Sequence, residues 1–171
     1  MTILTTARLT LAPPTRDHFP ACAALWARPE VAQHITGRPN TAEECWARVL
    51  RYAGHWALHG WGFWVATETA TGRFVGELGF MDFRRDIDPP IGEAPEIGWV
   101  LAPEMQGRGY ATEAARAALA WGRDRFGKVR AVCMIKPGNA ASLAVAGRLG
   151  FAEYARTTYH GRDELLLQRV L

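Results

Sequence analysis

The chain has 171 residues, 49% hydrophobic and 22% charged, which is the composition of one soluble globular domain with its own core. Twenty basic and 17 acidic residues give a net charge of +3 without a basic run, which argues against a nucleic-acid partner. Three widely spaced cysteines form no disulfide framework and no metal motif, and no segment is long enough to span a membrane. We therefore expect a cytoplasmic protein with buried thiols, no metal and no membrane contact.

The first 60 residues predict one strand and then two helices. Residues 3–13 alternate apolar and polar positions and end at two prolines, as a strand does. Residues 15–35 carry apolar side chains at helical spacing, and Pro29 is expected to break this helix in two. Residues 40–60 begin with a capping box and keep one apolar face, which indicates a more regular helix.

The remaining chain alternates strands and helices. Residues 62–83 predict a hairpin, and the proline-rich stretch 84–95 predicts an exposed loop. The later elements are a strand at 96–101, a helix at 110–127, a strand at 129–136, a short helix at 139–151, and two strands in 152–171 around His160 and Gly161. The order β-α-α-β-β-β-α-β-α-β-β predicts a mixed α/β domain of the α+β type over residues 1–171, with about seven strands.

A glycine-rich segment, QGRGYAT at 106–112, lies between a predicted strand and a helix. The unpaired N–H groups at a helix N-terminus favour an anion such as phosphate, and Arg108 adds a guanidinium that suits phosphate geometry. Thr112 replaces the third glycine of a dinucleotide fingerprint, and no Walker lysine follows, so neither common nucleotide motif fits. A plain surface turn before a helix is the alternative.

Two polar residues begin the next helix. Asn139 and Ser142 in NAASLAVAGRLGF place an amide and a hydroxyl where a ligand could bind them. Each could equally be a helix N-cap.

At this point the sequence resembles a known family. Residues 96–122 resemble motif A of the GNAT superfamily of acyl-CoA-dependent N-acetyltransferases, whose signature of Gln or Arg, two residues, Gly, one residue, and Gly or Ala is met by Gln106 to Ala111. Residues 139–151 resemble motif B, and with residues 5–19 they look most like the branch of the ribosomal-protein alanine N-acetyltransferases. The resemblance implies a single GNAT domain with helices on both faces of its sheet.

The resemblance also implies how acetyl-CoA binds as co-substrate. Its pyrophosphate would lie on the backbone of Gln106, Gly107, Arg108, Gly109, Tyr110, Ala111 and Thr112, with Asn139 nearby. The strands on either side of the motif A helix splay apart in this family, and the pantetheine arm fills the gap. Backbone groups of Trp99, Val100 and Leu101 would bond the arm, and an N–H near Val100 or Leu101 would polarise the thioester carbonyl.

The implied reaction is direct attack of an amine on the acetyl group, with no covalent enzyme intermediate. Ser142 is the candidate acid or the hydrogen-bond donor to the departing sulfur. Glu96 and Glu77 are the candidate bases, and alternation along the strand places Glu96 on the same side as Gly98 and Val100. His55, His59 and Asp82 are lesser candidates.

The acceptor side is predicted from an aromatic segment and an acidic loop. Trp61 lies between two glycines and would form one wall of an acceptor pocket. Asp82, with two further loop aspartates, would attract a cationic amine. The predicted function is N-acetyl transfer to a primary amine, either a peptide N-terminus or a small molecule, and a homodimer is possible. The alternatives are a non-catalytic acyl-CoA-binding sensor and a nucleotide-binding or nucleic-acid-binding protein.

Overall fold

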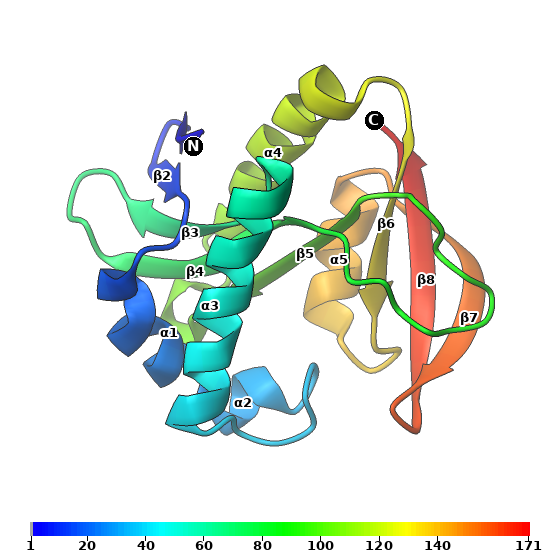
Figure 1. Cartoon of the computed structure of the whole chain (residues 1–171), viewed down its shortest axis with the longest axis horizontal. Helices are drawn as coiled ribbons and strands as arrows, with labels where there is room; N and C mark the ends of the chain where they lie inside the picture. The colour runs from blue at the N-terminus through cyan, green and yellow to red at the C-terminus, as the bar shows by residue number, and fades with distance from the viewer. Residues whose placement is uncertain (1) are drawn as a thin grey trace.

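A mixed sheet of eight strands crosses the protein in the order β1-β2-β3-β4-β5-β6-β8-β7 (Figure 1). The structure is a computed structural model that describes residues 2–171. The strands are β1 (Leu4–Thr5), β2 (Leu9–Ala12), β3 (Phe63–Glu68), β4 (Phe74–Met81), β5 (Glu96–Leu101), β6 (Arg130–Ile135), β7 (Ala152–Tyr159) and β8 (Arg162–Val170). The mixed α/β fold expected from the element order is confirmed.

The number of strands corrects the expectation of about seven. The single strand predicted at residues 3–13 is a small antiparallel hairpin, in which Leu4 of β1 lies opposite Leu11 of β2. Thr6 closes its turn, because its N–H donates to the Leu9 carbonyl and its hydroxyl accepts from the Leu9 N–H at 2.9 Å. The inward-facing positions shift from Leu4 to Leu9 and Leu11 across this turn, but no glycine or proline marks the shift in the sequence.

The helices are α1 (Phe19–Trp26), α2 (Pro29–Ala32), α3 (Ala42–His59), α4 (Tyr110–Phe126) and α5 (Ala140–Arg148). The predicted break at Pro29 is confirmed, because this proline begins α2 after an extended residue. The predicted capping box of α3 is also present, with Thr41 and Glu44 each accepting a backbone N–H of the other. None of the helices in the described part of the chain is long and apolar enough to cross a membrane.

Helices cover both faces of the sheet. On one face, α1 and α3 pack on Val65 of β3 through Cys22 and Val49. On the other face, α4 lies close to the sheet because Gly122 faces Phe80 of β4 without a side chain between them. A Cβ at Gly122 would come within 2.8 Å of the Phe80 ring. This tight contact fixes α4, and with it the glycine-rich segment at its start.

Strands β5 and β6 run parallel but diverge, as Figure 1 shows near the centre of the molecule. Among the described residues they share a single register pair, Glu96 with Val132, whereas β4 and β5 share six. The two strands therefore leave a gap beyond Glu96, towards the end of β5 that leads into α4.

Candidate active site

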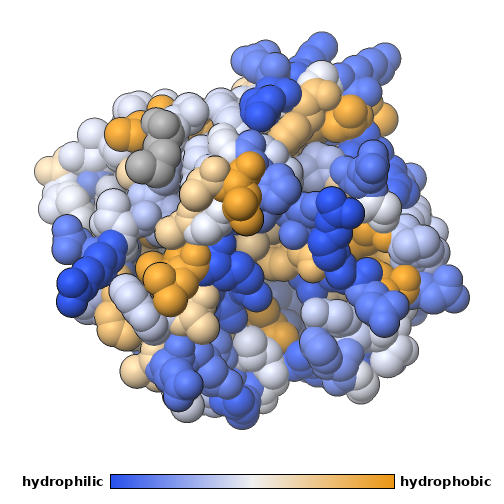
Figure 2. All heavy atoms as spheres, viewed as in Figure 1, coloured by the Kyte–Doolittle hydropathy of each residue, from blue (hydrophilic) through white to orange (hydrophobic). Residues whose placement is uncertain are grey.

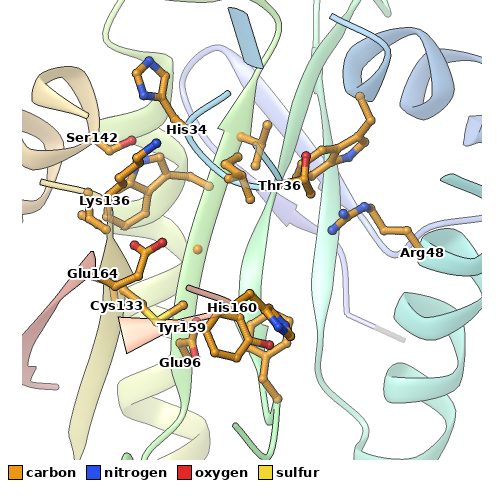
Figure 3. A pocket seen from close by; sticks show the side chains of 18 of the residues that line it. His34, Thr36, Arg48, Glu96, Cys133, Lys136, Ser142, Tyr159, His160 and Glu164 are labelled. Atoms are coloured by element: carbon orange, nitrogen blue, oxygen red, sulfur yellow. The ribbon is translucent and has the colours of Figure 1, made fainter. Parts of the chain in front are cut away.

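A cavity of about 1000 Å³ opens from the gap between β5 and β6. It extends under α3 and the loop between α2 and α3 on one side, and under the β7–β8 hairpin on the other. In Figure 2 strongly hydrophilic side chains gather around a hollow between these two sides. Figure 3 shows Ser142, Lys136 and Glu164 on one side of β5 and Arg48 on the other.

The glycine-rich segment folds as its sequence requires. Gly107 and Gly109 have φ values of 74° and 80°, in the left-handed region that favours glycine. Gly109 is the N-cap of α4, so the following N–H groups lie at the positive end of a 17-residue helix without intrahelical acceptors. A Cβ at Gly107 would meet no atom within 4 Å, so the backbone there is open to a ligand.

Side chains from the first hairpin hold this segment in place. Arg8 forms an ion pair with Glu113 of α4 at 2.6 Å and donates to the Arg108 carbonyl at 3.0 Å. The Tyr110 hydroxyl donates to Glu68 at the end of β3 at 2.7 Å. The loop is thus tied to β2 and β3, and a rigid loop binds an anion with less loss of conformational entropy.

The backbone of β5 offers hydrogen-bonding groups to the gap. Neighbouring residues of a strand direct their N–H and C=O groups to opposite sides. The Ala102 N–H bonds to Val75 on β4, and the Pro95 carbonyl accepts from Val132 on β6. By this alternation Trp99 and Leu101 direct their backbone groups towards the gap, whereas Val100 directs its groups towards β4.

The start of α5 resolves the two possible N-caps. Asn139 is the N-cap, because its side-chain oxygen accepts the Ser142 N–H at 3.1 Å. The Ser142 hydroxyl is therefore not the cap, and both residues line the cavity. Ser142 is half-buried, and Figure 3 shows its hydroxyl among the side chains that line the cavity.

Glu96 lies at the floor of the cavity, at the point where β5 and β6 separate. The regular register of β4 with β5 places it on the same side as Gly98 and Val100, as the alternation predicted. Arg85 binds it through two hydrogen bonds of 2.7 and 2.8 Å. Burial raises the pKa of the Glu96 carboxyl, and the Arg85 guanidinium opposes this shift.

Glu77 occupies a deeper position. It is fully buried on β4 and accepts hydrogen bonds from the Trp26 indole at 2.9 Å and from the Tyr52 hydroxyl at 3.3 Å. Its other oxygen, Oε1, has no partner among the described residues. Trp26 and Tyr52 line the cavity but Glu77 does not, so one layer of side chains separates this carboxylate from the open space.

The predicted acceptor residues lie outside the cavity lining. Trp61 packs edge-on against Phe126 at 5.1 Å between ring centroids, near the end of α4. Asp82 forms an ion pair with Arg84 at 2.7 Å. Asp82 follows Met81, which lies opposite Glu96 in the register of β4 with β5, but neither Trp61 nor Asp82 lines the cavity. The acceptor contact predicted for them therefore has no support from this cavity.

The two histidines are also engaged elsewhere. His55 uses both ring nitrogens, because Nδ1 donates to the Trp61 carbonyl at 2.6 Å and Nε2 accepts the Asp82 N–H at 3.0 Å. Burial lowers the pKa of His55, which agrees with this neutral form. His59 stacks on it at 4.4 Å between centroids. Neither histidine lines the cavity.

Several cavity residues were not identified from the sequence. Glu164 of β8 is buried in the lining, and burial raises the pKa of its carboxyl. Tyr159 and His160 come from the β7–β8 turn, and Arg48 comes from α3. Their elements were predicted correctly, but no local motif marks these side chains, since only the tertiary fold brings them to Glu96. Among residues 2–171 no cluster of three or more metal-ligating side chains occurs.

Comparison with known proteins places the chain in a family. The model of the GNAT acetyltransferase domain matches residues 8–152. A GNAT-family acetyltransferase structure from Bordetella pertussis is 34% identical, with 99% of each chain covered and a TM-score of 0.85. An acetyltransferase structure from Agrobacterium tumefaciens is 28% identical, covering 99% of this chain and 94% of the other, with a TM-score of 0.83.

A more distant structure and two curated proteins are also similar to the chain. A coenzyme A complex of RimL, a ribosomal L7/L12 α-N-protein acetyltransferase, shares the fold with a TM-score of 0.78 at 23% identity, over 99% and 98% of the chains. Protein YkkB of Bacillus subtilis is 38% identical over 101 residues, or 58% of this chain and 55% of YkkB. The FsC-acetyl coenzyme A-N(2)-transacetylase of Aspergillus fumigatus is 30% identical over 152 residues, or 86% of this chain. The chain spans 63% of that relative's length.

A glycine-rich helix start beside two diverging parallel strands is the architecture of an acyl-CoA-dependent N-acyltransferase domain. The model of the GNAT acetyltransferase domain matches most of the chain and identifies the family. The chain belongs to the GNAT acetyltransferase family.

Proposed function

We propose that the protein transfers the acetyl group of acetyl-CoA directly to a primary amine. The main support for this proposal is that the parts of the site are adjacent along one strand. The glycine-rich segment, the gap between β5 and β6, and the cavity with its acids follow one another along β5. The RimL acetyltransferase and the FsC transacetylase are both named for N-acetyl transfer, which supports the same function for this chain.

The residues present fit the coenzyme. The open left-handed glycines Gly107 and Gly109 leave room for a pyrophosphate on the N–H groups at the start of α4, and Arg108 is exposed beside them. The gap beside Trp99 and Leu101 would hold the pantetheine arm through backbone hydrogen bonds. Acetyl-CoA supplies the activated acyl group, and a preorganised N–H of β5 would stabilise negative charge on the carbonyl oxygen.

In the proposed reaction the amine nitrogen bonds to the carbonyl carbon and the carbon–sulfur bond breaks. One proton passes from the nitrogen to a base, and one reaches the sulfur. Glu96 is our candidate base, since it is the acid nearest the divergence of the strands, with Glu77 as a second candidate through Tyr52. Ser142 is the candidate proton donor to sulfur, because its hydroxyl is free of the capping role.

Release of coenzyme A thiol from acetyl-CoA, measured with a panel of amines, tests the proposal. We expect turnover with at least one amine, and a loss of kcat in Ser142→Ala and Glu96→Gln. Glu93→Gln is the matched control, because Glu93 is exposed in the loop before β5 and does not line the cavity. Tight coenzyme binding without turnover of any amine would instead support the alternative, an acyl-CoA-binding sensor.

The three buried free cysteines accord with a cytoplasmic location.

A further inference from the structure

The acceptor half of the cavity is rich in cationic side chains. Six basic and three acidic residues line the cavity. Two of the acids already have partners, Glu44 with Arg38 at 2.6 Å and Glu96 with Arg85 at 2.7 Å. The lining residues without an ion pair in the described part of the chain are the bases Arg48, Arg51, Lys136 and Arg162 and the acid Glu164. A positive excess therefore faces the ligand.

Arg48 has an unused donor inside the cavity. It projects from α3, and its guanidinium carbon lies 3.6 Å above the Trp26 ring. Its Nε is buried and has no hydrogen-bond partner among the described residues. Figure 3 shows the guanidinium pointing into the cavity.

Arg162 repeats this arrangement from the opposite wall. It begins β8, and its Nε is likewise buried without a partner in the described chain. Its Nη1 would lie 2.6 Å from a Cβ at Gly37, so the side chain reaches across to the loop between α2 and α3. A buried donor left without a partner destabilises the folded protein. Two such donors on facing walls indicate that the acceptor atoms arrive with a ligand.

Arg51 completes the set on the same face of α3 as Arg48. Its guanidinium carbon lies 5.7 Å from the Phe83 ring centroid, and Arg85 lies 4.2 Å from the same ring. Desolvation, with smaller repulsion from Arg48 and Arg85, lowers the pKa of Arg51. Glu96 neutralises Arg85, whereas Arg48 and Arg51 have no ion-pair partner in the described part of the chain.

These arginines are distinct from the coenzyme loop. None of residues 106–112 lines the cavity. Helix α4 packs on the sheet face that carries Phe80, whereas α3 packs on the opposite face. The pyrophosphate therefore has its own site, and the cationic excess is left for the acceptor.

We propose that the acceptor amine carries an anionic group, a carboxylate or a phosphate, that Arg48, Arg51 and Arg162 bind. This inference rests on the proposed acetyl transfer and names the class of its substrate. Guanidinium groups suit both anions through paired N–H donors. The same positive potential disfavours an ammonium ion, so it also helps the bound amine to lose the proton that must leave before attack.

Matched pairs of amines test the proposal by acetyl-CoA consumption. The pairs are phosphoethanolamine with ethanolamine, β-alanine with β-alaninamide, and the peptide amide Ala-Asp-Ala-Ala with Ala-Asn-Ala-Ala. We expect the anionic member of at least one pair to have a kcat/KM higher by about 10- to 100-fold, the effect of one hydrogen-bonded charge pair. The pair that responds identifies a small metabolite or a peptide as the source of the anion.

Substitutions test whether the arginines cause the preference for the anionic amine. Arg48→Gln and Arg51→Gln should lower kcat/KM for the anionic member more than for the neutral member, so that the preference within each pair falls towards one. Arg48→Lys should restore part of it. Because Arg48 packs on Trp26, the exposed Arg51 is the variant least coupled to folding. Arg123→Gln, an exposed arginine of α4 outside the cavity lining, is the control for loss of one charge.

Equal or better reaction of the neutral member in every pair would overturn the proposal. If no amine reacts, the acetyl-transfer proposal fails. The proposal of an anionic acceptor can then still be tested by calorimetry of the same pairs with coenzyme A-saturated protein. Tighter binding of an anionic member, lost in Arg51→Gln but kept in Arg123→Gln, would support it. Equal binding of the members of each pair would reject it.

Discussion

Gly109→Val probes the assignment of the coenzyme to the start of α4. Gly109 has a φ of 80° and is the N-cap of this helix. A Cβ there would lie 3.5 Å from Arg8 Nη2, an ordinary contact, so the protein itself has room for a side chain. The valine would instead occupy the space through which a phosphate approaches the backbone. Coenzyme binding should therefore suffer more than folding.

The two effects can be estimated separately. A non-glycine residue in the left-handed region costs about 1–2 kcal/mol of unfolding free energy. One hydrogen bond from a backbone N–H to a charged phosphate is worth about 1.5–3 kcal/mol. Loss of a single such bond therefore raises the Kd for coenzyme A by about 10- to 150-fold.

Gly127→Val separates strain from binding. Gly127 ends the same helix with φ 75° and ψ −160°, a conformation almost exclusive to glycine, and a Cβ there would meet no atom within 4 Å. We expect Gly127→Val to lose at least as much unfolding free energy in urea as Gly109→Val, and calorimetry to show a large rise in Kd for Gly109→Val alone. Unchanged coenzyme affinity in Gly109→Val, or an equal loss in Gly127→Val, would refute the assignment.

Three further changes test the fold and the chemistry. Gly122→Leu should lower the unfolding free energy in urea by about 1–3 kcal/mol, because its side chain overlaps Phe80, and a loss below that range would mean that α4 shifts freely. Ser142→Ala should lower kcat by about 10²- to 10⁴-fold at an unchanged KM for acetyl-CoA, and an unchanged kcat would exclude the hydroxyl as acid. Arg85→Gln should move the acid limb of the pH–rate profile to higher pH, since Arg85 lowers the pKa of Glu96 and only the ionised carboxylate accepts a proton. A stationary limb would exclude Glu96 as the base.

The predictions from local sequence were accurate wherever neighbouring residues decide the structure. The capping box at Thr41, the break at Pro29 and the turn at His160 and Gly161 all appear as predicted, because each depends on a few adjacent dihedral angles and hydrogen bonds. The division of the first strand into β1 and β2 was missed, because one threonine supplies the turn without a glycine or proline as marker.

Predictions that needed distant contacts were less complete. The aromatic and acidic character of Trp61 and Asp82 indicated an acceptor side, yet contacts with Phe126 and Arg84 hold both outside the cavity lining. Conversely, Glu164 has no local motif, because it enters the cavity only when β8 inserts beside β6. A short-range sequence pattern contains no information about a contact with a residue that is many positions away in the sequence.

The family, the order of the elements and the left-handed glycines before α4 can all be inferred from local sequence. Those features depend on motifs and backbone geometry that a few neighbouring residues encode. The divergence of β5 and β6 at Glu96 becomes visible only in the folded protein, as do the arginines from α3 and β8 that face one another across the cavity. Charge in a cavity is the sum over side chains from separate elements, and folding alone brings those elements together.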